Sequence, residues 1–369
     1  MEAGARGPQE GRIAFVVSHI EYALGADASE AGSCPKGMTE GYPSQESAFV
    51  FEREPLRPRT GEDARAFRRR LFGTALADPT VHDLCSRPDL GPPEPGFRTV
   101  FASDARAHGL DLDGVDSDSA GVPAPATCAH DDLVGMGGSR GIDNQWFRVV
   151  GCSRSFQSTG PSNTFAIEML TGSWGILITL DGVDDLGNDP EVRVGLFANA
   201  DPIELGPDRR PLAWATYSAE PDPRFRATTR GRIDEGVLTT DPVDLRWWNV
   251  INDMRLERPL DAARLRLRLE GESGARGILG GYSPVEAAYD VTYGFRTGLD
   301  ASFAPSPAAR RMGSAVGQAR VLGHTCHGAW QAIHRLADAN PDPDTGQCRS
   351  ISMQFRIEAV PAFVVEITP

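Results

Sequence analysis

The stretch RLRLRLE (residues 264–270) decides the fold class, because leucine and charged side chains alternate in it without interruption. Leu265, Leu267 and Leu269 therefore share one face of an extended chain, and the arginines share the other. A period of two residues is typical of a strand with one buried and one solvated face. We expect a strand here, in a sheet that covers an apolar core.

Short runs of the same kind continue on both sides of this stretch and are separated by Gly, Pro, Asp and Asn. They include WGILITLDG, EVRVGLFA, LAWATYSA, RFRATTRGRI, GVLTTDPVDLRWW, DMRLERPL and ARGILGGY. Repeated short strands with turn residues between them are typical of antiparallel sandwiches. The sequence therefore predicts a mostly β fold, a jelly-roll-like antiparallel sandwich with a few peripheral helices.

The ends of the chain differ from this body. Residues 1–11 are polar and predicted to be a disordered tail, and residues 12–140 form a lead-in subdomain. The body spans 141–369; it begins with a helix predicted over 143–156, with Asp143 as its N-cap. It ends in a helix–strand unit, with a helix predicted over 318–339 and a strand over 350–365.

The net charge of the chain limits the classes of partner that it is expected to bind. The net charge is −14, and a protein that binds nucleic acid through phosphate contacts normally shows a basic surface instead. We therefore expect no nucleic-acid partner. No apolar run approaches the roughly 20 residues that a membrane-spanning helix needs, so we expect no membrane span.

Six cysteines are present, and none forms a CxxC pair. They are Cys34, Cys85, Cys128, Cys152, Cys326 and Cys348. An even set without metal-binding spacing favours disulfides and an oxidising compartment, periplasmic, cell-surface or secreted. The spacing suggests that neighbours pair in order: Cys34–Cys85, Cys128–Cys152 and Cys326–Cys348. No secretory leader is visible in MEAGARGPQEGRIAFVV, so we expect a leader, with or without a lipid anchor, on the precursor.

The segment HGLDLDGVDSDSAG (108–121) is the leading candidate site. It carries Asp111, Asp113, Asp116 and Asp118, and aspartates at such spacing supply the oxygen ligands that calcium prefers. The EF-hand pattern fails, since the acids stand at positions 1, 3, 6 and 8 and position 12 is a valine. A calcium loop of another type and a solvated acidic turn both stay open. A calcium loop would need a further carboxylate, and Asp131, Asp132 and Asp143 are the candidates. Two other acidic turns, 181–189 and 340–346, share the composition.

Two weaker candidate sites remain. His324, His327 and His334 lie within the helix predicted over 318–339, where they would suit copper or zinc; partly exposed helix histidines are the alternative. Three tryptophans would suit stacking on a sugar if they are exposed: Trp214, Trp247 and Trp248. The alternative is that they pack in the core. The segment GGSRG (137–141) matches a nucleophile motif, but no convincing strand precedes it, so it does not support a serine hydrolase.

Three segments carry a resemblance to a known group. They are GIDNQWFRVVGC (141–152), LITLDGVDDLGNDPEVRVGLF (177–197) and the last forty residues. With the D-x-D-G loop, a G-I-D-N-Q segment leading to a cysteine, and an N-D-P-x-V turn before a strand, the chain resembles uncharacterised bacterial exported proteins and lipoproteins. The resemblance covers about two-thirds of the chain. It implies export and nothing about activity.

Three functions follow as hypotheses. The first is a non-catalytic extracytoplasmic binding or structural module, stabilised by calcium, whose ligand is a glycan or a protein; the lack of a catalytic motif favours a protein that is not an enzyme. The second is a secreted glycan-active enzyme that uses a groove of the sandwich. The third is a periplasmic copper or zinc protein that uses the three histidines.

Overall fold

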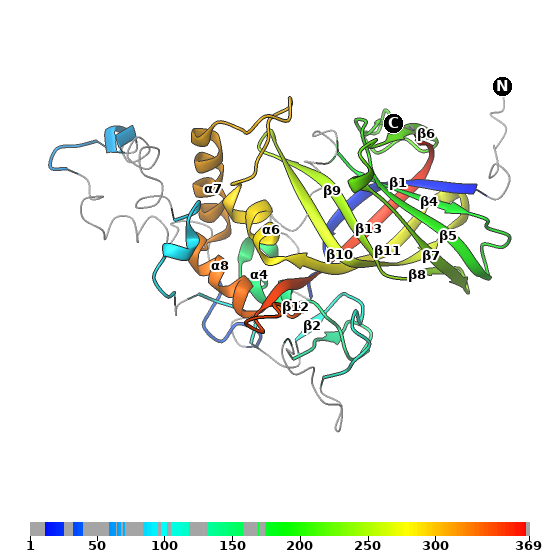
Figure 1. Ribbon diagram of the computed structural model, residues 1–369, viewed down its shortest axis with the longest axis horizontal. Helices are drawn as coiled ribbons and strands as arrows, with labels where there is room; N and C mark the ends of the chain where they lie inside the picture. The colour runs from blue at the N-terminus through cyan, green and yellow to red at the C-terminus, as the bar shows by residue number, and fades with distance from the viewer. Residues whose placement is uncertain are drawn as a thin grey trace.

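A computed structural model gives the fold (Figure 1). It describes residues 12–25, 32–39, 59–63, 65–67, 69–70, 84–94, 97–101, 105–117, 128, 131–157, 169 and 174–366. The predicted tail, residues 1–11, lies outside the described residues.

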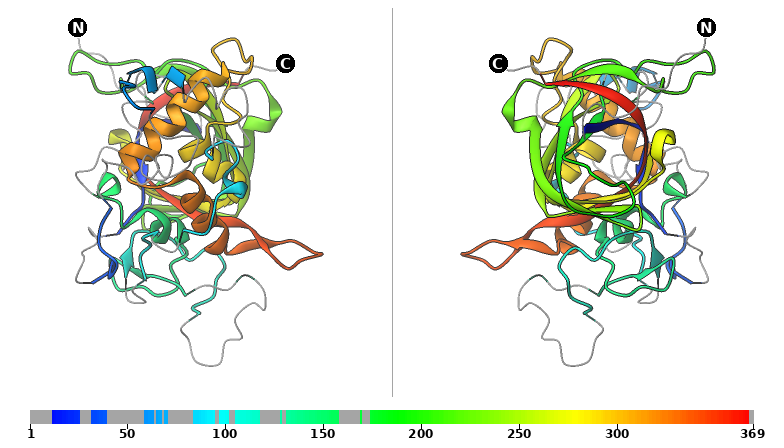
Figure 2. Two further views of the ribbon diagram at one scale, coloured as in Figure 1. Left: turned by 90° about the vertical axis from the view of Figure 1, so that its left-hand side faces the viewer. Right: turned by 90° about the vertical axis from the view of Figure 1, so that its right-hand side faces the viewer.

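Within the described residues, eight antiparallel strands form a closed ring in the order β1-β4-β5-β7-β8-β10-β11-β13, and β13 pairs back with β1. Figure 2 shows this ring end-on. Its members are β1 (Arg12–Tyr22), β4 (Ile176–Asp181), β5 (Asp189–Ala198), β7 (Arg226–Asp234), β8 (Val237–Thr240), β10 (Met254–Leu269), β11 (Ala275–Pro284) and β13 (Cys348–Glu366). The mostly β prediction is confirmed, but the strands belong to one closed sheet and not to the two packed sheets of a sandwich.

Three further strands extend the ring. β9 (Val243–Ile251) pairs with the first half of β10, β6 (Ala215–Ala219) runs parallel to the end of β13, and β12 (Ala339–Pro341) pairs with its start. A bulge between Asp261 and Arg264 divides β10, so that its second half pairs with β8 and β11. One long strand therefore serves both the ring and the β9 extension.

The side-chain alternation of residues 264–270 appears in the structure as predicted. Leu265 and Leu267 are buried inside the sheet, Leu269 packs against the core, and Arg266 and Arg268 face solvent. The β9–β10 turn is made by Asn252 and Asp253, both with positive φ (52° and 59°). Such a pair matches the twist of a two-residue hairpin, and Asn and Asp tolerate this conformation better than most residues.

Helices gather at one end of the ring (Figure 1). They are α4 (Gln145–Val150), α6 (Val285–Tyr289), the π-helical turn η5 (Asp290–Gly294), α7 (Ala308–Leu322) and α8 (Cys326–Arg335). No helix in the described part of the chain is long and apolar enough to cross a bilayer. The short 3-10 turns are η1 (Pro88–Leu90), η2 (Arg154–Phe156), η3 (Pro223–Phe225) and η4 (Gly271–Ser273).

The prediction of a single helix over 318–339 is wrong. Gly323 ends α7 in the left-handed conformation (φ 68°), where a glycine has no steric penalty. Thr325 then begins α8, and its side chain accepts a hydrogen bond from the Gly328 amide at 3.0 Å. A second, separate helix results. The final strand is confirmed as β13.

The described residues between 84 and 157, called the loop region below, contain little regular structure. The loop region holds η1, α4, η2 and a two-stranded pair, β2 (Arg106–Ala107) with β3 (Val134–Gly135). β1 lies upstream of it in the sequence and belongs to the closed sheet, so the expected lead-in subdomain contributes its first strand to the body.

All six cysteines form disulfides, as predicted, but the predicted pairing in sequence order is wrong. The bridges are Cys34–Cys152, Cys85–Cys326 and Cys128–Cys348. Two of them link the loop region to distant elements, Cys85 to α8 and Cys128 to the start of β13. The bridges therefore tie the irregular part of the chain to the helices and the sheet.

Candidate metal centre

The candidate centre begins with the path of residues 110–114. Asp143 accepts hydrogen bonds through Oδ2 from the amides of Leu112 (2.5 Å) and Asp113 (3.2 Å), and its own amide donates to the Leu110 carbonyl (3.2 Å). The side chain of Leu112 is buried and anchors the turn. The segment that leads into α4 thus fixes the acidic loop. Asp143 is not the predicted helix cap, because α4 begins at Gln145 after Asn144.

A buried glutamine on β13 attaches both segments to the sheet. Gln354 accepts from the Leu110 amide (2.7 Å) and donates to the carbonyls of Leu110 (2.8 Å) and Asp143 (2.6 Å). Glycines make room for it: a Cβ on Gly280 would lie 2.6 Å from its Oε1, and one on Gly109 would lie 2.9 Å from its Nε2. The position of the loop therefore depends on the closed sheet.

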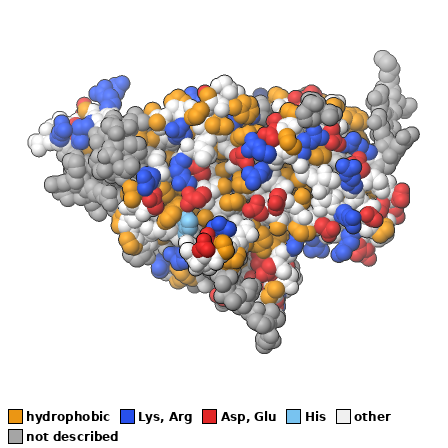
Figure 3. Space-filling view, in the orientation of Figure 1, with side chains coloured by type: hydrophobic (Ala, Val, Ile, Leu, Met, Phe, Trp, Pro, Cys, Tyr) orange, Lys and Arg blue, Asp and Glu red, His pale blue; other side chains and the backbone are white. Residues whose placement is uncertain are grey.

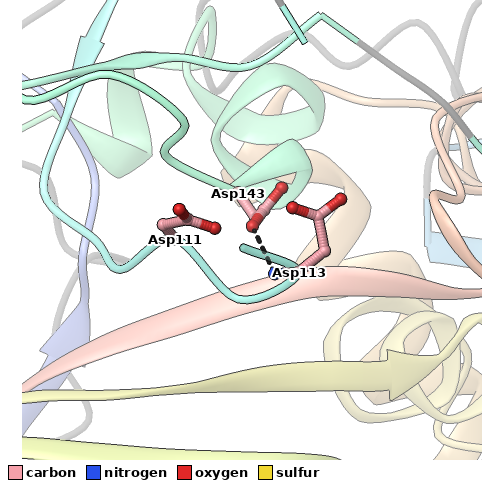
Figure 4. Close-up of side chains that lie close together, drawn as sticks. All are labelled: Asp111, Asp113 and Asp143. Carbon is pink, nitrogen blue, oxygen red and sulfur yellow. Dashed lines mark hydrogen bonds between the residues drawn. The ribbon is translucent and has the colours of Figure 1, made fainter. Parts of the chain in front are cut away.

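Three carboxylates meet at this turn (Figure 4). One oxygen from each of Asp111, Asp113 and Asp143 can be chosen so that all three lie within 4.8 Å of one another. Asp143 is buried, while Asp111 and Asp113 are exposed. Such a group has an open side and a fixed base, the arrangement that a hard cation with additional water ligands requires.

Each of the three carboxylates accepts backbone hydrogen bonds through one of its two oxygens. Asp111 Oδ1 accepts from the Gly114 amide (2.6 Å) and Asp113 Oδ1 from the Val115 amide (2.8 Å), as Asp143 Oδ2 does from Leu112. Within the described residues, the second oxygen of each accepts no hydrogen bond. Three oriented oxygens are thus available to a cation.

The electrostatics of the group favour a positive partner. Burial raises the pKa of Asp143 to about 8, and the nearby charge of Asp113 adds to the shift. Burial also raises the pKa of Asp111, again with a contribution from Asp113. Asp338, outside the group of three, adds to the shift of Asp143, and burial raises its own pKa to about 7. Carboxylates that repel one another and are poorly hydrated gain most from a bound cation.

The other predicted calcium ligands have different roles. Asp132 accepts from the Ser117 amide (2.8 Å), and Ser117 Oγ accepts from the Asp132 amide (3.1 Å). Asp116 forms an ion pair with Arg140 (2.9 Å). The backbone carbonyl of Asp131 accepts from Gln145 and Arg148. Asp118 lies outside the described residues.

The two other acidic turns are stabilised by their own backbones. Asp189 accepts from the amides of Asp184 and Glu191, and Asp342 accepts from those of Asp344 and Thr345. These bonds lower the pKa of Asp189 and of Asp342. Among the described residues, neither turn contributes to a group of three possible metal ligands.

The three histidines of the copper or zinc hypothesis do not meet. His324 Nδ1 is paired with the Tyr293 hydroxyl (2.9 Å) in the interior, where burial lowers its pKa to about 3. His327 is buried near Glu94 (3.9 Å), and His334 contacts Glu286 (3.2 Å). The group of three possible metal ligands found among the described residues contains none of them, and Cys326 is in a disulfide.

The positions of the three tryptophans support core packing and not sugar stacking. Trp247 is buried against Phe355, and Trp248 is buried against Phe225. Only Trp214 of the three is exposed (39%), and it packs against Phe363. Alternation along β9 would expose one of Trp247 and Trp248, but Phe225 and Phe303 cover Trp248, so both indoles are buried.

The sequence did not indicate Gln354 as part of the site, because it lies 244 residues from Leu110 in the chain. Gln354 stands in the polar phase of β13, between Ser352 and Arg356, so the alternation of that strand does not distinguish it. No family model, curated protein or solved structure matches the chain. Function is therefore argued from the geometry of the site itself.

Proposed function

We propose that this protein is a non-catalytic extracytoplasmic binding or structural module in which calcium, bound by Asp111, Asp113 and Asp143, fixes the loop region to the closed sheet. The observation that carries the proposal is the convergence of three carboxylates at one turn. The ion would neutralise the buried Asp143 and link a loop that otherwise relies on hydrogen bonds.

The choice of calcium follows from the ligands. All three are carboxylates, which favour hard cations over copper or zinc. Two of them are on an exposed turn, and calcium accepts an irregular set of oxygens and waters more readily than magnesium does. The three disulfides support a compartment outside the cytoplasm.

The test is a thermal melt of chelator-treated protein with calcium, with magnesium, and with EDTA. Calcium should raise the Tm of the wild type, and metal analysis of protein purified without chelator should find about one equivalent of calcium. In Asp143→Asn the calcium effect should disappear, while the variant in EDTA should be at least as stable as the wild type because a costly buried carboxylate is gone.

The matched control is Asp131→Asn, which removes the same charge from the same region outside the cluster. It should keep the wild-type response to calcium. An equal response in Asp143→Asn and Asp131→Asn would contradict the proposal, as would protein that is stabilised no more by calcium than by added NaCl at equal ionic strength.

A further inference from the structure

The outer surface of the closed sheet carries arginines from neighbouring strands. Arg193 on β5 lies directly opposite Arg230 on β7, and Arg232 and Arg266 lie on either side of Thr239. All four arginines are exposed. Like charges directly opposite each other destabilise a sheet. Among the described residues, none of the four forms an ion pair with a carboxylate; Asp181, which lies opposite Arg193 on β4, is paired with Arg12 instead (3.1 Å).

Three of these arginines, Arg193, Arg230 and Arg232, line a groove on an acidic protein. Two adjoining hollows of about 550 and 680 Å³ share Glu191, Arg230, Asp241 and Pro242. The first also contains Arg232 and Thr239; the second also contains Arg193 and Asp181. Figure 3 shows Lys and Arg side chains interspersed with Asp and Glu at the right-hand end of the molecule, where Figure 1 places β5, β7 and β8.

The two kinds of group fit one class of ligand. A guanidinium binds carboxylate or sulfate oxygens through paired hydrogen bonds. The carboxylates of Glu191 and Asp241 accept hydrogen bonds, and sugar hydroxyls are the donors that such groups bind. A phosphate backbone offers few hydroxyl donors to Glu191 and Asp241, and a flat membrane would not enter a groove.

We propose that this groove binds a polysaccharide that bears carboxylate or sulfate groups, with its anionic groups on Arg193, Arg230 and Arg232 and its hydroxyls on Glu191 and Asp241. The inference names a ligand for the binding module proposed above. It uses a different site, so it can fail while the calcium site stands.

The experiment is isothermal titration of calcium-loaded protein with oligosaccharides of polygalacturonate and of dextran sulfate, which distinguish carboxylate from sulfate. Neutral dextran, polyphosphate, a single-stranded oligonucleotide and vesicles with anionic phospholipid serve as comparisons. We expect saturable binding of at least one acidic oligosaccharide and none of neutral dextran. Arg193→Ala/Arg230→Ala should weaken that binding at least about tenfold.

The matched control is Arg276→Ala/Arg335→Ala, which removes two exposed arginines outside the groove and should leave the affinity within about twofold. Glu191→Gln/Asp241→Asn separates recognition from bulk charge. It should weaken binding if these carboxylates accept from hydroxyls, whereas attraction by charge alone would strengthen it. Every variant is first checked for an unchanged Tm and an unchanged calcium titration, which keeps this test independent of the calcium site.

Three results would overturn the inference: no binding of either acidic oligosaccharide, equal affinity in the two arginine double variants, or tighter binding in Glu191→Gln/Asp241→Asn. Preference for polyphosphate, the oligonucleotide or vesicles over both oligosaccharides would also overturn it, in favour of a phosphate-bearing partner.

Discussion

The closed sheet and the loop region are stabilised in different ways. In the sheet, each ring strand is hydrogen-bonded on both sides, and side chains such as Leu265 and Phe355 fill the interior. In the loop region, regular hydrogen bonding is scarce, and the chain is fixed by disulfides, by Gln354 and by the carboxylate of Asp143. The comparison teaches that the sheet can serve as a rigid frame, whereas the loop region depends on a few specific links.

The largest effect is expected from the loss of a disulfide that ties the loop region to a distant element, here α8. Cys85–Cys326 closes a loop of 241 residues, and in the chain-entropy model its loss costs about 5 kcal/mol. Cys85→Ala/Cys326→Ala should therefore lower the free energy of unfolding by about that amount in non-reducing urea titrations. Hydrogen exchange should rise in the loop region before it rises in the ring strands. Simultaneous loss of protection in both regions would contradict the comparison.

A core residue of the sheet gives the next effect. Phe355 is buried against Tyr22 and Trp247, and Phe355→Ala should cost about 3–5 kcal/mol. The loss should appear as global unfolding in thermal and urea melts. Phe303→Ala, at a half-exposed side chain, is the control and should cost less than about 1 kcal/mol. A similar cost for both would show that the ring interior is not the main source of stability.

Gln354 tests the attachment between the regions. Gln354→Ala leaves the Leu110 amide and two carbonyls without their partner, which should cost about 2–3 kcal/mol and weaken calcium binding. Gln347→Ala, on an exposed turn, is the control. Urea titration and calcium calorimetry measure the two effects. Unchanged calcium affinity in Gln354→Ala would mean that the loop does not need the sheet for its conformation.

Taken over a single pH unit, the smallest expected effect concerns pH. The pKa of His324 is lowered to about 3 by burial, so the folded state favours the neutral ring. Its contribution to stability is complete above pH 6.5 and should be lost as the pH falls from 6.5 towards 3, by about 1 kcal/mol per pH unit. His324→Gln should flatten this acid limb in Tm measurements. An acid limb as steep as that of the wild type would assign the pH dependence to other groups.

The sequence predicted what local periodicity encodes. The alternation around Leu265 indicated a strand, and the even cysteine count indicated disulfides. Asp143 was one of three candidate carboxylates, and the structure brings it to Asp111 and Asp113. Each of these inferences rests on residue type and on short spacing in the chain.

The rest depends on contacts between residues far apart in the chain. β1 meets β13 across more than three hundred residues, so closure of the sheet leaves no local signal. The disulfides join cysteines that lie 118 to 241 residues apart, so their order in the chain does not reveal the pairing. The error in the predicted single helix is of another kind. Gly323 and Thr325 are local stop and start signals for a helix, and the sequence already contains them.

The most direct test of the central claim is calorimetric titration of calcium into chelator-treated wild type, Asp143→Asn and Asp131→Asn. We predict one calcium per molecule in the wild type and in Asp131→Asn, and a loss of affinity of about a hundredfold or more in Asp143→Asn. Equal binding in all three proteins, or no binding in the wild type, would contradict the assignment of calcium to Asp111, Asp113 and Asp143.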